Sequence, residues 1–71
     1  MNQCERILKY MEQFGSISNR EAVIELGIGR LASRIHDLTR EGYIIERETV
    51  KGKNKFGEET HFTRYRIGGK A

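Results

Sequence analysis

The chain has 71 residues and a formal net charge of +3; hydrophobic residues make up 37% of it and charged residues 32%. This length allows one small domain over residues 1–71, and the composition is too apolar for a disordered chain and too polar for a membrane protein. No apolar run is long enough for a signal peptide or a membrane-spanning helix, so we expect a cytoplasmic protein with no membrane partner.

The positive charge is concentrated in the second half of the chain. Residues 1–28 contain three basic and four acidic side chains, a balance of −1, while residues 29–71 contain ten basic and six acidic, a balance of +4. If the partner is a polyanion, we expect it to bind the second half.

No metal site, cofactor or catalytic group is predicted. Cys4 has no disulfide partner in the chain, and Cys4, His36 and His61 share no spacing of metal ligands. Glu58 and Glu59 precede His61, but no nucleophile, paired carboxylate or glycine-rich phosphate loop stands near them at a fixed spacing. We therefore expect a binding protein and not an enzyme, with a fold held together by packing.

Residues 3–14 are predicted to form an α-helix, because their apolar side chains recur at steps of three and four. Asn2 is placed to cap the start of this helix. Gly15 is placed to end it in the left-handed conformation that glycine adopts most easily. Cys4 is expected to be a buried apolar residue of the helix.

A second, short helix is predicted from Asn19 to Gly27. Ser18 and Glu21 form a capping box, in which the serine hydroxyl accepts from the Glu21 N–H and the carboxylate accepts from the Ser18 N–H. Ile17 precedes the cap as a hydrophobic staple. The side chains expected to point inward are Ala22, Val23 and Leu26.

A tight turn at residues 27–29, with Ile28 buried, leads to a third helix from about Arg30 to Glu41, and Gly42 ends it. The apolar stripe of this helix is Leu31, Ile35 and Leu38. With about 100° between successive residues, the polar face opposite the stripe carries Ser33, His36, Asp37 and Arg40, with Arg30 and Arg34 on its flank.

After Gly42 the apolar period changes to that of strands. Residues 43–50 and 60–67 are rich in β-branched and aromatic side chains and are predicted to form an antiparallel hairpin. The segment between them, residues 51–59, is expected to be a mobile loop, and residues 68–71 to be frayed. The side chains expected to be half-buried or packed in the hairpin are Tyr43, His61, Phe62 and Tyr65.

Three helices followed by a two-stranded antiparallel hairpin is the plan of an α+β winged helix-turn-helix domain, with residues 51–59 as the wing tip. Residues 22–45 resemble the small helix-turn-helix domains encoded by bacteriophages and prophages, and residues 61–67 resemble their wing. The most specific part is the run Leu-Gly-Ile-x-Arg-Leu-Ala-x-Arg-Ile at residues 26–35. Where similar domains usually have serine or threonine, this chain has Gly29, which can cap the helix but offers no hydroxyl to a phosphate.

The resemblance implies this fold and DNA binding, without implying a target. We expect a sequence-specific protein that binds double-stranded DNA, a transcription regulator of the phage or prophage type associated with the nucleoid of a bacterial host. The third helix is expected in the major groove and the wing on the backbone or the minor groove. The predicted DNA-binding residues are Asn19, Arg20, Arg30, Ser33, Arg34, Asp37, Lys51, Lys53 and Lys55.

Base reading is expected from the third helix. Arg30 and Arg34 can donate bidentately to guanine O6 and N7, and Ser33 can complete a base contact. Asp37 can accept from a cytosine amino group or orient one of the two arginines within the helix, and we favour the second role.

Phosphate contacts are expected from two other places. Asn19 and Arg20 lie at the start of the second helix, where the helix dipole favours an anion. The wing lysines, Lys51, Lys53 and Lys55, can neutralise phosphates or lie over a minor groove.

Some of these residues also have structural alternatives. Arg34 can form an ion pair with Glu41 or Glu25, and the wing lysines can belong to a solvated loop. The rival function is a phage-type interaction module or inhibitor that binds a host protein or a nucleoprotein complex. Basic residues over the third helix and wing favour DNA, whereas an exposed apolar patch on the first helix favours a protein partner. Repressor, excision factor and host-directed inhibitor all fit the sequence, and so does a homodimer.

Overall fold

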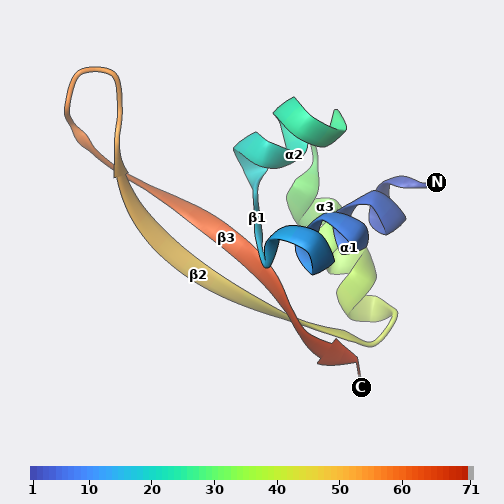
Figure 1. Cartoon of the computed structure of the whole chain (residues 1–71). Coiled ribbons are helices and arrows are strands. Elements are labelled where there is room, and N and C mark those ends of the chain that lie inside the picture. The colour runs from blue at the N-terminus through green and yellow to red at the C-terminus, as the bar shows by residue number, and fades with distance from the viewer. Residues whose placement is uncertain (71) are drawn as a thin grey trace.

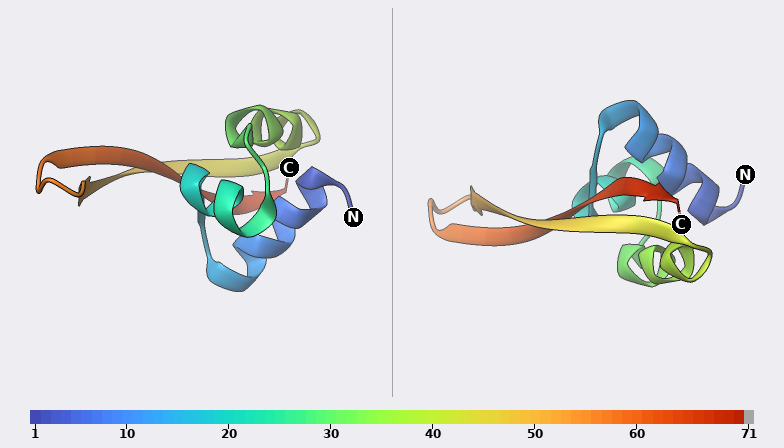
Figure 2. Two further views of the ribbon diagram at one scale, coloured as in Figure 1. Left: turned by 90° about the horizontal axis from the view of Figure 1, so that it is seen from above. Right: turned by 90° about the horizontal axis from the view of Figure 1, so that it is seen from below.

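The computed structural model describes residues 1–70, which form three helices and one antiparallel sheet (Figure 1). The elements in chain order are α1 (Gln3–Phe14), β1 (Ile17–Ser18), α2 (Asn19–Leu26), α3 (Leu31–Arg40), β2 (Tyr43–Lys53) and β3 (Glu59–Lys70). The helices gather around the base of the β2–β3 hairpin, and the tip of the hairpin projects away from them. In Figure 2 α1 and α3 flank the hairpin base as it is seen from above and from below; α1 packs against β3 and α3 against β2, and the two helices also contact each other.

The predicted bounds of α1 and its caps are confirmed. The Asn2 Oδ1 atom accepts from the Glu5 N–H at 2.8 Å, and Gly15 ends the helix with φ 86°. Because both caps are local signals, the sequence alone located this helix.

The capping box of α2 is also confirmed. The Glu21 carboxylate accepts from the Ser18 N–H at 2.9 Å, and the Ser18 hydroxyl accepts from the Glu21 N–H at 3.3 Å. Gly27 ends α2 in the left-handed conformation, with φ 68°. The predicted third helix, from about Arg30 to Glu41, was one residue too long at each end. Arg30 is the N-cap residue of α3 and Glu41 is its C-cap residue, so Gly29 does not cap this helix.

The sheet has three strands in the order β1-β3-β2, so the predicted two-stranded hairpin was incomplete. β1 pairs antiparallel with β3, Ile17 opposite Tyr65 and Ser18 opposite Arg64. A strand of two residues carries no periodicity, and its partner lies far along the chain, so the sequence did not reveal it. This pairing ties the segment between α1 and α2 to the hairpin.

The hairpin is longer than predicted at both ends. β2 and β3 pair from Tyr43 opposite Lys70 to Lys53 opposite Glu59, so the turn is confined to residues 54–58. The predictions of a loop over residues 51–59 and of a frayed tail were therefore wrong for residues 51–53, 59 and 68–70, and Ala71 lies outside the described residues. A strand ends where its backbone hydrogen bonds to the partner strand end. The glycines and lysines of these segments have a low strand propensity, which is why the sequence favoured a loop.

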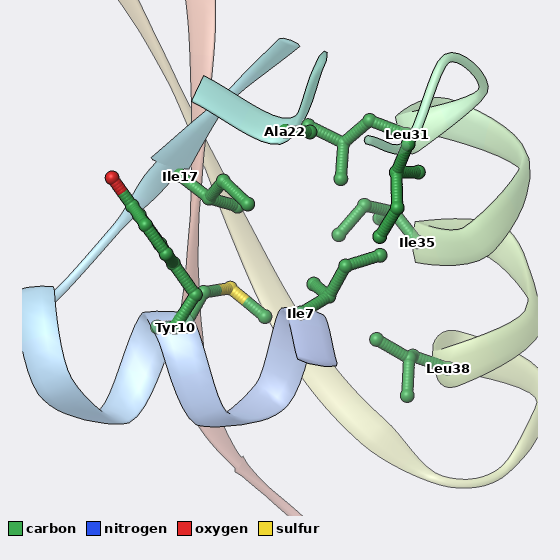
Figure 3. Close-up of a cluster of buried hydrophobic side chains, with 9 residues drawn as sticks. Ile7, Tyr10, Ile17, Ala22, Leu31, Ile35 and Leu38 are labelled. Atoms are coloured by element: carbon green, nitrogen blue, oxygen red, sulfur yellow. The ribbon is translucent and has the colours of Figure 1, made fainter. Parts of the chain in front are cut away.

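The core consists of nine side chains from α1, β1, α2, the following turn and α3 (Figure 3): Ile7, Tyr10, Met11, Ile17, Ala22, Ile28, Leu31, Ile35 and Leu38. The predicted burial of Ile28 and of the apolar stripe of α3 is confirmed. Figure 3 shows Ile7 of α1 pointing toward that stripe. This packing fixes α3 with its polar face outward.

Four burial predictions were wrong in whole or in part. Val23 is exposed, because Ala22 and Leu26 define the inner face of α2 and Val23 lies one step around the helix from it. Cys4 is only half-buried at the edge of the core. His61 is exposed and Phe62 is 41% exposed, because this part of β3 extends past the helices that cover the base of the sheet, but the Phe62 ring lies against Gly52 of β2, as hairpin packing requires.

Candidate nucleic-acid interface

The face of α3 opposite the core is polar and basic. Ser33, His36 and Arg40 are exposed there, and Arg30 is exposed at the start of the helix. Because these four side chains include no acid, the outward face of α3 can approach a polyanion without like-charge repulsion.

Arg34 and Asp37 lie on the flank of α3 that faces α1. Arg34 Nη2 is 3.3 Å from Asp37 Oδ2, and both side chains are about half-exposed. The Cys4 thiol of α1 lies 4.0 Å from the Arg34 carbonyl oxygen, and Arg34 Nε is buried with no hydrogen-bond partner within residues 1–70. The ion pair is the intrahelical contact that we favoured for Asp37, and the alternative partners Glu41 and Glu25 are not used for an ion pair with Arg34 in the described structure.

Arg64 of β3 holds the start of α2 against the sheet. Its Nη2 donates to Glu21 Oε1 at 2.7 Å and its Nε donates to Ser16 Oγ at 2.9 Å. Burial alone would raise the pKa of the Glu21 carboxyl, but hydrogen bonds from Ser18 and the nearby Arg64 charge outweigh it and lower the pKa. Glu21 therefore stays ionised and fixes the direction in which the N-terminus of α2 points.

A groove of about 810 Å³ lies between the starts of α2 and α3 and the outer half of the hairpin. Asn19 and Arg20 line it from α2, Ala32 lines it from α3, and Lys53 and His61 line it from the hairpin. Within residues 1–70, Arg20 and Lys53 form no ion pair. The groove therefore carries uncompensated positive charge.

The wing lysines are divided between the strand and the turn. Lys51 is opposite His61 and Lys53 is opposite Glu59 in the ladder, while Lys55 lies in the turn. Because side chains alternate along a strand, Lys51 and Lys53 fall on the sheet face that carries Tyr65, which is the face toward the core. Of these three lysines, Lys53 lines the groove, and Lys51 and Lys55 do not.

The structure places the predicted site residues in four groups. Asn19, Arg20 and Lys53 line the groove; Arg30 and Ser33 lie on the exposed surface of α3; Arg34 and Asp37 form an ion pair on its flank; and Lys51 and Lys55 lie along the wing. The groove residues that were not predicted include four polar residues of β3, which are Thr60, His61, Thr63 and Arg64. Alternation along β3 puts some of them on one face, but only the strand register shows that this face meets α2.

Residues 1–70 contain neither a metal-binding cluster nor a membrane-spanning helix. No group of three or more histidine, cysteine, aspartate or glutamate side chains in this range is arranged to hold a metal ion. No helix in the same range is long and apolar enough to cross a membrane.

Comparison with known proteins agrees with the observed arrangement. Residues 2–69 match a family model that is described as a winged helix-turn-helix domain. Comparisons with curated proteins and with solved structures return no match. The family match spans the helices α2 and α3, the turn that joins them and the hairpin that forms the wing. The chain belongs to the family of winged helix-turn-helix domains, which points to DNA as its partner.

Proposed function

We propose that this protein binds double-stranded DNA in a sequence-specific manner and acts as a small transcription regulator of the phage or prophage type. In this proposal α3 enters the major groove and the wing contacts the backbone or the adjacent minor groove. The observation that carries it is the positively charged groove, with Arg20 and Lys53 unpaired within the described residues, directly beside the basic outward face of α3.

The dimensions of α3 suit the major groove. An α-helix with its side chains is about 10–12 Å across, and the major groove of B-DNA is about 12 Å wide. Arg30 and Ser33 lie at the exposed start of α3, where base edges are usually read. Arg34 would reach bases from the flank of the helix, with Asp37 orienting its guanidinium.

The start of α2 suits a phosphate. The Ser18 hydroxyl already accepts from the Glu21 N–H, which leaves the N–H groups of Asn19 and Arg20 at the positive end of the helix dipole. Both side chains line the groove, and Arg64 fixes the direction of this helix end through Glu21. A phosphate in the groove would meet backbone donors, the Asn19 amide and the Arg20 cation together.

The proposal is of binding without catalysis, because it uses only cations, hydroxyls, an amide and backbone N–H groups along an open surface. It needs no metal and no cofactor. It places the protein in the cytoplasm of a bacterial host, at the nucleoid. A homodimer would read an inverted repeat with one α3 in each half-site.

Selection of bound duplexes from a random pool at about 0.15 M salt tests this proposal. We expect a recovered motif, and we expect the double variant Arg20→Ala/Lys53→Ala to bind that motif more weakly than the parent. Arg6→Ala/Lys9→Ala is the matched control, because it also removes two cations, from exposed positions on α1 away from the groove. A pool that stays random, or equal losses in the groove and control variants, would contradict the proposal.

A protein-interaction role is the second candidate, and one observation favours it. Val23 and Ile24 are exposed apolar side chains on α2, and Phe14 is exposed at the end of α1. Under this alternative the partner is a host protein or a nucleoprotein complex. If this alternative is right, Val23→Ser/Ile24→Ser abolishes function in the host while DNA binding stays at the parent level. If the DNA-binding proposal is right, this variant keeps both its function in the host and its DNA binding.

A further inference from the structure

The tip of the hairpin presents an aromatic ring to solvent. Phe56 is 81% exposed, more than any other large hydrophobic side chain within residues 1–70. We propose that Phe56 is a wedge that inserts between base pairs in the minor groove of bound DNA and bends the duplex. This inference rests on the proposed function, because it requires that the partner is double-stranded DNA.

The turn that carries Phe56 is held in one conformation by Asn54. The Asn54 Oδ1 atom accepts from the Phe56 N–H at 2.9 Å and from the Glu58 N–H at 3.0 Å, and the Asn54 N–H donates to the Glu58 carbonyl at 3.0 Å. Gly57 completes the reversal of the chain with φ 78°. Because the turn is already ordered, inserting the ring costs little further conformational entropy.

The charge around Phe56 favours a nucleic acid over an apolar protein surface. Lys55 precedes the ring directly, and Lys53 and Lys51 follow at alternate positions down β2. The two acids of this segment are Glu58, whose Oε1 accepts from Asn54 Nδ2 at 3.1 Å, and Glu59, which lies opposite Lys53 in the ladder, so the three lysines leave a net charge of +1 over residues 51–59. Proteins that insert an apolar side chain between base pairs in the minor groove also carry cations, because phosphates flank the opened base step. The wing tip combines an exposed apolar ring with neighbouring cations in the same way.

The length of the wing matches the spacing of the grooves. β1 pairs with β3 at Arg64, and β3 continues from there to Glu59 with no further strand on that edge in the described structure. These five residue steps rise about 17 Å. Half a turn of B-DNA is also about 17 Å, and Phe56 lies in the turn beyond Glu59, so a wing anchored where β1 and the start of α2 meet β3 is long enough to span from one groove to the next.

Phe14 shows that exposure alone does not single out Phe56. Phe14 is 64% exposed at the end of α1, but its ring stacks on Tyr10 with the centroids 4.6 Å apart, so it packs on the protein's own surface. Phe14 also lies on α1, outside the groove and the wing. This residue therefore supplies a matched control for the loss of an exposed phenylalanine.

The experiment measures binding and bending on the same duplex. A selected duplex of about 30 base pairs carries a donor and an acceptor dye at its two ends, so that energy transfer reports a bend. Fluorescence anisotropy of the same duplex reports binding. The proteins compared are the full chain and its variants Phe56→Ala, Phe56→Leu and Phe14→Ala.

We expect the parent to raise energy transfer, as a kink of about 20–90° requires. Phe56→Ala should still bind, roughly tenfold more weakly, and should lose the bend, while Phe56→Leu should keep much of it because leucine is also an effective wedge. Phe14→Ala should match the parent in both readouts.

Three results would overturn the wedge. A parent that binds without bending, or a Phe56→Ala variant that bends as the parent does, removes the wedge and leaves the proposed function intact. A parent that fails to bind any duplex removes the proposed function and the wedge with it. Anisotropy therefore separates the two failures.

Discussion

Replacing Arg64 by alanine tests how the fold fixes the start of α2. Arg64 donates two hydrogen bonds, at 2.7 Å to Glu21 and at 2.9 Å to Ser16, and the ion-paired side chains of Arg64 and Glu21 are 25% and 32% exposed. A buried hydrogen bond to a charged group contributes about 1.5–3 kcal/mol, and an exposed ion pair about 0.2–1 kcal/mol. We therefore expect Arg64→Ala to lower the free energy of unfolding by about 1–2 kcal/mol.

For a domain of this size the loss corresponds to a fall in Tm of about 5–15 °C, measured by circular dichroism at pH 7. Arg66→Ala is the matched control, because Arg66 also lies on β3 and is 2.6 Å from Glu48, but their side chains are 50% and 55% exposed. The control should lose less than about 1 kcal/mol. Equal losses of unfolding free energy in the two variants would refute the view that Arg64 fixes the start of α2. The less exposed Arg64–Glu21 pair would then contribute no more to stability than the more exposed Arg66–Glu48 pair.

Three further predictions concern acid stability, the wing and base reading. The folded-state pKa of Glu21 lies below its usual 4.5, so the ionised carboxylate stabilises the fold above that pH. The parent should therefore have a higher free energy of unfolding in urea than Glu21→Gln, and this difference should shrink as the pH falls below 4.5. A difference that does not change with pH would contradict a stabilising role of the Glu21 carboxylate. Changing the wing lysines to alanine should weaken binding to the selected site and to random DNA alike. It should also reduce the slope of log affinity against log salt by about 0.9 for each phosphate that is no longer neutralised. An unchanged slope would show that the wing does not contact the duplex. Arg30→Ala or Arg34→Ala should cost about 1–3 kcal/mol of binding to the selected site and relax base choice, and folded variants that bind it as the parent does would exclude base reading by these residues.

Local signals in the sequence were enough to locate the helices. Asn2 and Gly15 bracket α1, and the capping box of Ser18 and Glu21 starts α2 at the predicted residue. In each case the residues that decide the boundary lie within a few positions of it. The exposed polar face of α3 was predictable for the same reason, because helical periodicity alone assigns its inner and outer faces.

The long-range parts of the candidate interface could not be predicted in this way. Glu21 and Arg64 are 43 positions apart, and only the pairing of Ser18 with Arg64 brings them together. The groove exists because this pairing sets α2 against the hairpin, so its lining residues Thr63 and His61 carried no signal of their own. Strand register depends on contacts between distant segments, which a single sequence does not display.

Phe56 was overlooked because residues 51–59 were interpreted as a mobile loop. The composition of this segment correctly indicated exposure, but the Asn54 hydrogen bonds that order the turn depend on the backbone conformation. An aromatic residue beside a hairpin also packs against it more often than it projects into solvent. The ordered turn that presents the Phe56 ring to solvent became visible only with the structure.

Sequence-specific DNA binding by this protein is tested most directly by the ratio of two dissociation constants, measured by anisotropy at about 0.15 M salt. One duplex carries the selected motif, and the other is a scrambled duplex of the same length and base composition. We predict that the motif is bound at least roughly 10³-fold more tightly, the lower end for specific DNA-binding proteins. Dissociation constants that agree within a few-fold would contradict sequence-specific DNA binding by this protein.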